Sequence, residues 1–163
     1  MKFMFPKIIF GLALATVIAS VTQTSPLAQS APKPQGIEGV WDATITIVRC
    51  DTGAAIGTGH AILMFIAGGS LTDITPDFVH SAGLGTWRHL RGPNYTAVDR
   101  FFVFNTDGNF SGTQVVTRPD IALNRTASEY TNTATSEFFN SADQLVSTGC
   151  STVIATRLDQ GSD

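Results

Sequence analysis

The sequence has no cluster of basic residues of the kind that binds nucleic acids or anionic membranes. Its 163 residues carry 10 basic and 13 acidic side chains, which gives a formal net charge of −3 at neutral pH. Affinity for phosphate-rich partners depends on concentrated positive charge. We therefore expect no nucleic acid among the partners of this chain.

Familiar catalytic and metal-binding signatures are missing too. There is no phosphate-cradling glycine-rich loop with its lysine, no Gly-x-Ser-x-Gly elbow, no His-Glu-x-x-His and no Cys-x-x-Cys. The three histidines, His60, His80 and His89, stand singly without the paired spacing of ligands. We expect scattered surface or hydrogen-bonded histidines, no bound metal and no cofactor, and the sequence identifies no catalytic residue.

The first thirty residues have the order of a secretory signal peptide. Lys2 and Lys7 precede the mainly apolar stretch 8–20, and small and polar residues follow at 25–31. The apolar stretch is shorter than the roughly 20 residues that span a bilayer. We expect residues 1–30 to be removed after Ala28 or Ser30, leaving a periplasmic or secreted chain without a membrane span. An uncleaved membrane anchor is the alternative.

The remaining chain is expected to form one domain. Residues 31–38 are a proline-containing lead-in, 39–159 the folded domain and 160–163 a tail. Without Lys2 and Lys7, 8 of the 10 basic side chains remain against all 13 acidic ones. This length is sufficient for a single hydrophobic core.

Only two cysteines occur, Cys50 and Cys150. In an oxidising compartment two cysteines usually form one disulfide, which here closes a loop spanning nearly the whole domain. Two free buried thiols are the alternative.

After residue 38 the chain shows short runs rich in Thr, Val, Ile and Phe, separated by Gly, Asn, Asp and Pro. This pattern is typical of an all-β domain. Strands are predicted near residues 39–50, 58–67, 70–75, 84–91, 94–104, 110–123, 127–139 and 144–158. Eight up-and-down antiparallel strands can close into a barrel and leave no free edge. We therefore predict a closed antiparallel eight-stranded β-barrel of one domain.

The cysteines suggest a register for closure between the first and last strands. If Cys50 and Cys150 lie directly opposite each other, Trp41 faces Asp159 and is a diagonal neighbour of Arg157 on the inner face. The disulfide then lies on the outer face. In the same way, a four-residue loop at 140–143 pairs Phe138 with Leu145.

Alternation along the seventh strand predicts which of its side chains are enclosed. The inner set is Tyr130, Asn132, Ala134 and Phe138, and the outer set is Glu129, Thr131, Thr133, Thr135 and Glu137. Such alternation is typical of a half-buried strand.

Gly39-Val-Trp41 at the start of the first strand and Arg157 at the end of the last resemble the lipocalin pattern. In lipocalins a Gly-x-Trp opens the barrel and a basic residue packs over the tryptophan. The segments 65–73, 85–87 and 147–157 also resemble a group of uncharacterised exported bacterial barrel proteins, and the small barrels of allene oxide cyclases and dirigent proteins are similar in size. True lipocalins continue into a helix, whereas this chain ends at Asp163, which weakens the analogy with ligand carriers and leaves the bacterial group or a cyclase-type barrel open.

Five residues are candidate ligand contacts. Trp87, His89 and Arg91 alternate on one face of one strand, and Tyr130 and Phe138 lie on an inner face. An aromatic wall with a few donors suits a pocket for a small apolar molecule. Alternatively, Trp87 is ordinary core, and His89 and Arg91 lie at the solvated rim.

The run Phe101–Phe104 is apolar on both faces of its strand and therefore needs an outer cover. A homo-oligomer interface is one interpretation, and cover by residues 31–38 or 76–83 is the other. The neighbouring Asp99 is expected to form an exposed salt bridge with Arg100 or another base. A buried Asp99 with a raised pKa, able to donate or accept a proton, is the alternative.

Three functions fit this reading. The leading hypothesis is an exported barrel that binds a small apolar ligand in its interior. The second is a cyclase or isomerase of the allene oxide cyclase type, which works mainly by restraining its substrate. The third is a structural protein of the cell envelope with a solid core. A cavity of several hundred Å³ would separate the first two from the third, because an eight-stranded barrel can also be filled by side chains.

Overall fold

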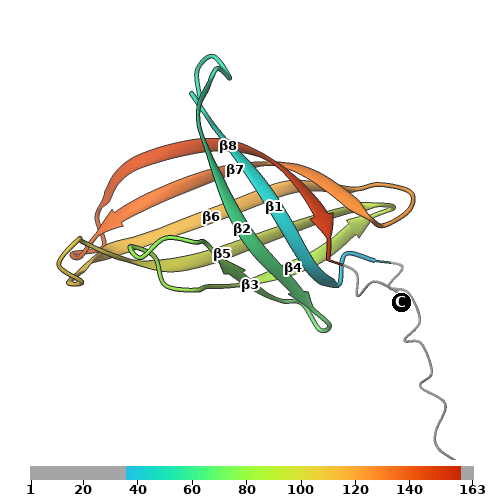
Figure 1. The fold of residues 1–163 in the computed structure, drawn as a ribbon, viewed down its shortest axis with the longest axis horizontal. Coiled ribbons are helices and arrows are strands. Elements are labelled where there is room, and N and C mark those ends of the chain that lie inside the picture. The colour runs from blue at the N-terminus through green and yellow to red at the C-terminus, as the bar shows by residue number, and fades with distance from the viewer. Residues whose placement is uncertain (1–35, 159–163) are drawn as a thin grey trace, which may run out of the picture. The chain divides into compact units, whose positions relative to one another are not determined.

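Eight antiparallel strands form a closed barrel in which each strand pairs with its neighbours in sequence and β8 returns to β1 (Figure 1). The strands are β1 (Gly39–Val48), β2 (Ala55–Ile66), β3 (Ser70–Ile74), β4 (Gly83–Arg91), β5 (Asn94–Phe104), β6 (Phe110–Leu123), β7 (Glu129–Asn140) and β8 (Leu145–Arg157). The predicted fold class and all eight strands are confirmed. This computed structural model describes residues 36–158, so the predicted signal peptide, most of the lead-in and the tail lie outside the described residues.

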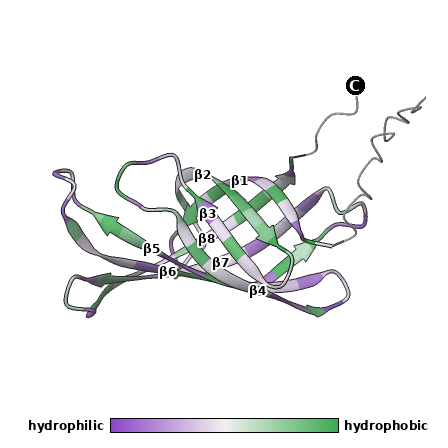
Figure 2. Ribbon diagram, turned by 90° about the horizontal axis from the view of Figure 1, so that it is seen from below, coloured by the Kyte–Doolittle hydropathy of each residue, from purple (hydrophilic) through white to green (hydrophobic). Residues whose placement is uncertain are grey.

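Side chains alternate between the inside and the outside of the barrel along each strand, and Figure 2 shows the resulting change of hydropathy from residue to residue. In β7, Tyr130, Asn132 and Ala134 are buried, whereas Thr131 and Thr133 are exposed, as the sequence predicts. Within residues 36–158 no helix is long and apolar enough to cross a membrane.

The pairing between β1 and β8 differs by two residues from the predicted register. Trp41 lies directly opposite Arg157, and Cys150 lies opposite Val48 rather than Cys50. Cys50 follows the end of β1 and still forms the predicted disulfide with Cys150, with Cα atoms 5.2 Å apart. The register prediction was wrong because it required both cysteines to lie within paired strands. A shift of two residues keeps each paired side chain of β1 and β8 on its predicted face. Cys50 and Cys150, however, both line a cavity inside the barrel, so the predicted position of the disulfide on the outer face is wrong. Cys50 lies beyond the end of β1, where strand alternation no longer sets the direction of its side chain.

The β7–β8 hairpin corrects a second predicted pairing. Phe139 lies opposite Leu145, and Phe138 lies opposite Ser147 instead of Leu145, because a bulge interrupts the ladder between them. A bulge adds one residue to one strand, which simple counting from the loop cannot anticipate.

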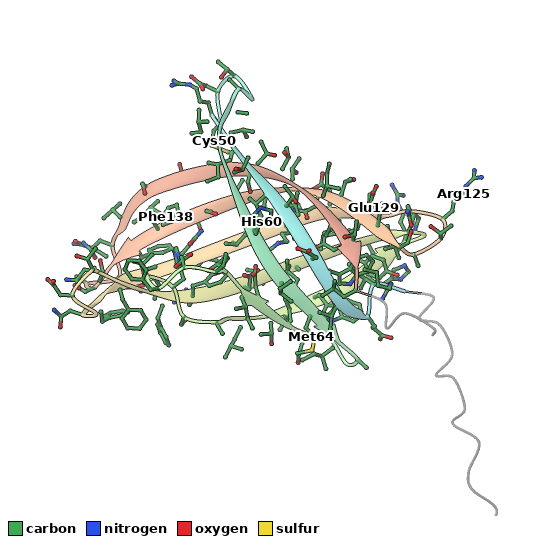
Figure 3. All side chains as sticks on the ribbon, viewed as in Figure 1. Cys50, His60, Met64, Arg125, Glu129 and Phe138 are labelled. Atoms are coloured by element: carbon green, nitrogen blue, oxygen red, sulfur yellow. A yellow bond between two sulfur atoms is a disulfide. The ribbon has the colours of Figure 1, made fainter. Side chains whose placement is uncertain are left out.

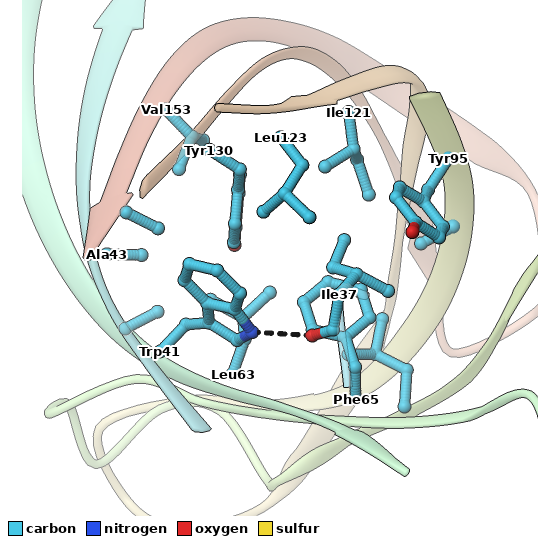
Figure 4. Close-up of a cluster of buried hydrophobic side chains, with 14 of the residues drawn as sticks. Ile37, Trp41, Ala43, Leu63, Phe65, Tyr95, Ile121, Leu123, Tyr130 and Val153 are labelled. Atoms are coloured by element: carbon cyan, nitrogen blue, oxygen red, sulfur yellow. Dashed lines mark hydrogen bonds between the residues drawn. The ribbon is translucent and has the colours of Figure 1, made fainter. Parts of the chain in front are cut away.

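One half of the barrel is packed solid with apolar and aromatic side chains (Figure 4). Trp41 and Ile37 are fully buried, and the indole nitrogen of Trp41 donates a hydrogen bond of 2.8 Å to the carbonyl oxygen of Ile37. Tyr130 packs edge-on against Trp41, with ring centroids 4.9 Å apart, and against Phe65 at 5.9 Å. Residues just before β1 thus fold back and plug this half of the barrel.

Arg157 closes the packed half from outside the aromatic cluster. Its guanidinium carbon lies 4.1 Å from the centroid of the Trp41 ring, and its nitrogens donate to the carbonyl oxygens of Gly36, Glu38 and Ala127. Gly39 has a φ of 128°, and a Cβ there would lie 2.5 Å from Arg157 Nη1. The glycine is therefore required both by its backbone and by the arginine beside it.

The Phe101–Phe104 run is only partly covered. Phe101 is buried inside the barrel, whereas Phe102 is 55% exposed on the outer face. The segment before β4 runs along the edge of β5: Ser81 donates to the Phe102 carbonyl at 2.9 Å, and Phe104 donates to the Val79 carbonyl at 2.7 Å. The 76–83 segment therefore completes the backbone pairing of β5 and leaves the outer ring of Phe102 accessible.

Candidate functional site: a cavity above a buried ion cluster

The half of the barrel away from Trp41 is hollow. It holds a cavity of about 640 Å³ whose wall is mainly apolar. The apolar wall includes Ile45, Ile47, Val48, Ile56, Phe101, Val116, Ala134, Phe138 and Val153. Three of the lining residues are labelled in Figure 3: Cys50 lies in the turn between β1 and β2, His60 on β2 and Phe138 on β7. One end of the barrel is thus filled by packed side chains, and the other end has room for a ligand.

A buried ion cluster borders the cavity. Arg118 on β6 donates through Nη2 to Asp73 Oδ2 on β3 at 2.6 Å, and through Nη1 to Asp99 Oδ1 on β5. The side chains of Arg118, Asp73 and Asp99 are 4%, 2% and 0% exposed. Asp73 and Arg118 line the cavity, and Asp99 lies behind them. The cavity therefore has an apolar wall and an ionic floor.

Two glycines on β4 make this cluster sterically possible. β4 lies between the strands that carry Asp73 and Asp99, and it places Gly83 opposite Asp73 and Gly85 opposite Asp99. A Cβ on Gly85 would collide with the carbonyl oxygen of Val98 and lie 2.6 Å from Asp99 Cα. A Cβ on Gly83 would meet the ring of Phe101 at 2.6 Å. The absence of side chains here leaves the two carboxyl groups free to meet Arg118 across β4.

Burial dominates the electrostatics of the two carboxyl groups. It raises the pKa of Asp99 to about 6 against the opposing charge of Arg118, and the neighbouring charge of Asp73 raises it further. Burial likewise raises the pKa of Asp73, and the charge of Arg118 counteracts it. Burial would lower the pKa of Arg118, but Asp99 and Asp73 outweigh it and raise that pKa. Arg118 therefore stays charged, while the carboxyl pair can hold a proton near neutral pH.

Several buried polar atoms, some of them in the ion cluster, have no hydrogen-bond partner among the described residues. They are Asp73 Oδ1, Asp99 Oδ2, Asn132 Oδ1, Arg118 Nε and the hydroxyls of Thr75, Thr113 and Tyr130. Buried polar atoms are normally paired, so each such atom needs an explanation. Three of them are oxygens of carboxyl or amide groups, and the single obligate donor is Arg118 Nε. Within the cluster itself, the unpartnered atoms are therefore two carboxyl oxygens and one guanidinium N–H donor.

Polar side chains also lie nearer the opening of the cavity. His80 Nδ1 lies 2.9 Å from Asp77 Oδ1, and both residues line the cavity together with His60 and Arg49. Burial raises the pKa of Asp77, but the hydrogen bonds that its carboxylate accepts and the charge of His80 together outweigh burial, and the net shift is downward. Within the described residues no group of three or more His, Cys, Asp or Glu side chains could hold a metal ion.

The five candidate ligand contacts from the sequence are distributed over the barrel. Phe138 lines the large cavity. Trp87 and His89 line a smaller cavity of about 250 Å³ beside residues 36–38, and Arg91 is exposed. Tyr130 belongs to the packed half. The structure therefore does not bring these five side chains together around one space.

The surroundings of Asp99 differ from those expected from the sequence. It is 2% exposed, and its partner is the buried Arg118, whereas Arg100 is exposed on the opposite face of β5. The predicted exposed salt bridge is wrong because strand alternation points Asp99 into the barrel and its neighbour Arg100 outward.

Sequence reasoning missed Asp73 and Arg118. Each occupies an inward position of its strand, with Asp73 two residues after the buried Leu71 and Arg118 two residues after the buried Val116. The usable signal was therefore a charged residue of each sign at inward positions, accompanied by the alternating glycines Gly83 and Gly85.

The chain matches no protein-family model, no curated protein and no solved structure. The lipocalin resemblance is supported at the level of an eight-stranded closed barrel. Since fold alone does not fix function, the function has to be argued from the cavity and its floor.

Proposed function

We propose that this protein is an exported binding protein that holds a small, largely apolar molecule in the open half of its barrel. The cavity of about 640 Å³ carries this proposal. Ligand sites typically enclose about 300–1,000 Å³, with apolar walls and a few polar groups that orient the guest. The wall of Ile45, Phe101 and Val116 above Asp73 and Arg118 fits that description.

Export is supported by two independent features. Residues 1–30 have the sequence order of a signal peptide. The disulfide between Cys50 and Cys150 is of the kind that persists in oxidising compartments. We therefore propose that the protein binds its ligand in the periplasm or outside the cell.

A cyclase or isomerase is the second candidate, and the carboxyl pair favours it. Asp73 lines the cavity, and the pKa of the adjacent Asp99 is raised to about 6, so the pair can supply or accept a proton near neutral pH. Such an enzyme would use the same cavity, and it would be distinguished from a carrier by conversion of the extracted ligand. The hollow half weighs against a purely structural barrel with a solid core.

Filling the cavity tests the binding function. Val116 faces the cavity, and the preceding Val115 has the opposite orientation on β6. In Val116→Trp the indole occupies the space that the ligand needs, whereas Val115→Trp adds the same bulk outside. We expect the neutral lipophilic dye Nile red to bind the parent protein and Val115→Trp, and to bind Val116→Trp at least tenfold more weakly.

Solvent extraction of the purified protein followed by mass spectrometry gives a second measurement. We expect a small lipophilic molecule to co-purify with the parent protein and to be depleted from Val116→Trp. Absence of both dye uptake and an extracted molecule would contradict the proposed binding function.

A further inference from the structure

The ionic floor of the cavity contains more acid than base. Asp73 and Asp99 contribute two carboxyl groups, and Arg118 contributes one guanidinium. With both carboxyl groups ionised, the cluster carries one net negative charge in a site that excludes water from all three side chains. An uncompensated buried charge is costly, so the cluster has to take up either a proton or another cation.

The carboxylate oxygens at the base of the cavity lack a hydrogen-bond donor. Asp73 has a side chain that is only 2% exposed, it lines the cavity, and its Oδ1 has no hydrogen-bond partner among the described residues. Asp99 Oδ2 is likewise unpartnered when both carboxyl groups are ionised, whereas the two side chains hydrogen-bond each other when the pair holds a proton. Ionised carboxylates only accept hydrogen bonds, so a group that satisfies them must donate.

We propose that the Asp73–Arg118–Asp99 cluster is the recognition site for the protonated amine of an amphipathic ligand whose apolar part fills the cavity above it. This inference rests on the proposed binding function. An ammonium group supplies the missing positive charge and up to three N–H donors at the same point. The ligand class is therefore a primary amine with an apolar body.

Other head groups fit the floor less well. An alcohol can donate one hydrogen bond to Asp73, but it leaves the excess negative charge uncompensated. A carboxylate would meet Arg118, whose two terminal nitrogens are already engaged by Asp73 and Asp99, so that only Nε is left as an unpartnered donor. It would also add a third negative charge beside two acids. The order of affinity for one apolar chain is therefore amine, then alcohol, then carboxylate.

Binding of the amine displaces the proton that the carboxyl pair holds in its absence. The affinity for an amine therefore rises with pH until Asp99 is ionised, near the pKa of about 6 that burial gives it. The other ionisable groups near the floor or the opening are Tyr130 on β7, His60 on β2, His80 and Asp77 before β4, and Arg49 after β1. Of the two histidines, His80 acts on Asp73 through its charge, so His80→Asn separates the contribution of His80 to the pH profile from that of the carboxyl pair.

The experiment uses the secreted protein produced from the full-length chain, loaded with Nile red and titrated with n-octylamine, n-octanol or n-octanoate. All three probes carry the same apolar chain. At pH 8 we expect octylamine to displace the dye at least tenfold more effectively than octanol, with octanoate weakest. Between pH 8 and pH 5 the advantage of octylamine should fall by about tenfold, as expected for one proton with a pKa near 6.

Asp99→Asn tests the charge without touching the wall, because Asp99 does not line the cavity. The variant should lose most of the preference for octylamine and its pH dependence while binding octanol as before. Glu137→Gln is the matched control, since it removes one negative charge from the exposed face of β7. It should retain both the preference and the pH profile.

The outcomes separate the two proposals. Equal displacement by octylamine and octanol, or stronger displacement by octanoate, would overturn the amine site and leave the apolar cavity as a binding site. Failure of Nile red and of all three probes to bind would overturn both. Because the pH profile of the parent protein is itself diagnostic, the proposal stays testable even if Asp99→Asn does not fold.

Discussion

Arg118 on β6 hydrogen-bonds Asp73 on β3 at 2.6 Å, although two other strands separate them in the sheet. The contact crosses the inside of the barrel, whereas backbone pairing joins only adjacent strands. The same guanidinium also holds Asp99 on β5. One side chain therefore links three strands from within and separates the packed half from the cavity.

Replacing Arg118 by methionine should destabilise the protein strongly. The change leaves Asp73 and Asp99 buried without their counter-charge, and breaking a buried ion pair in this way costs about 3–5 kcal/mol. Urea unfolding at pH 7 measures the loss. Arg100→Met is the control, because Arg100 is exposed on the neighbouring strand and should change stability by less than about 1 kcal/mol.

Replacing both aspartates of the cluster should restore the stability that Arg118→Met loses. Adding Asp73→Asn and Asp99→Asn to Arg118→Met removes the two stranded charges, so the triple variant should recover most of the stability lost by the single one. Unfolding midpoints of the two variants at the same pH decide this. A triple variant as unstable as the single one would show that the guanidinium acts through packing rather than charge.

Asp99 should give the stability a distinct pH dependence. Its pKa is about 6 in the folded protein against an ordinary value of 3.8, so the folded state binds more protons than the unfolded state between these values. The contribution of Asp99 to stability is therefore fully present below about pH 4 and is lost as the pH rises through 6. Asp99→Asn should gain stability relative to the parent protein over that interval, as measured by thermal unfolding from pH 4 to pH 7. A constant difference between the two proteins would argue against a raised pKa.

Gly85→Ala should be among the most damaging single-methyl changes in this barrel. The new Cβ would collide with the Val98 carbonyl and press on the backbone of Asp99. Forcing extra atoms into a packed interior costs about 1–3 kcal/mol, and backbone neighbours yield less than side chains. Gly59→Ala is the control, because the nearest atom to its Cβ lies 3.9 Å away. Equal unfolding midpoints for the two variants would disprove the steric role of Gly85.

Replacing both Cys50 and Cys150 by serine should leave the barrel folded but less stable. Chain-entropy models give about 4–5 kcal/mol for a loop of this length, and measured losses are often smaller. Circular dichroism should retain the β-sheet spectrum while urea midpoints fall. Peptide mapping of the parent protein under non-reducing conditions should yield one linked pair of peptides.

The barrel was predictable from sequence because its strands and turns are each determined by short stretches of neighbouring residues. Thr- and Val-rich runs set the strands, and residues such as Asn140 set the turns, where the Asn140 side chain accepts hydrogen bonds from the backbone of Ala142 and Gln144. Alternation then fixed the faces, so the interior positions of Tyr130 and Asn132 followed. Register was harder, because the bulge after Phe138 depends on the fit of two strands and not on the composition of either.

The candidate site was mostly beyond sequence reasoning for a different reason. Asp73 and Arg118 are 45 positions apart, and their meeting depends on the curvature of the closed sheet and on the bare surface of β4. Aromatic residues drew attention to Trp87 and His89, yet those side chains line a small cavity beside residues 36–38, away from the large one. The aromatic residues therefore indicated the packed end of the barrel as the binding site. The hollow end is hollow because large side chains are absent there, and aromatic content does not reveal such an absence.

The seam between β1 and β8 also determines when the barrel can be completed. Every backbone hydrogen bond of this seam joins residues roughly a hundred positions apart, and so do the contacts of Arg157 with Trp41 and of Cys150 with Cys50. Contacts between such distant segments form slowly, since a long loop must first be ordered. Until then, β1 presents an unpaired edge that can join with strands of other molecules. During synthesis the chain therefore exposes the edge of its first strand from the moment that strand emerges until the last one arrives, and this interval is when the protein is most prone to pair with other chains.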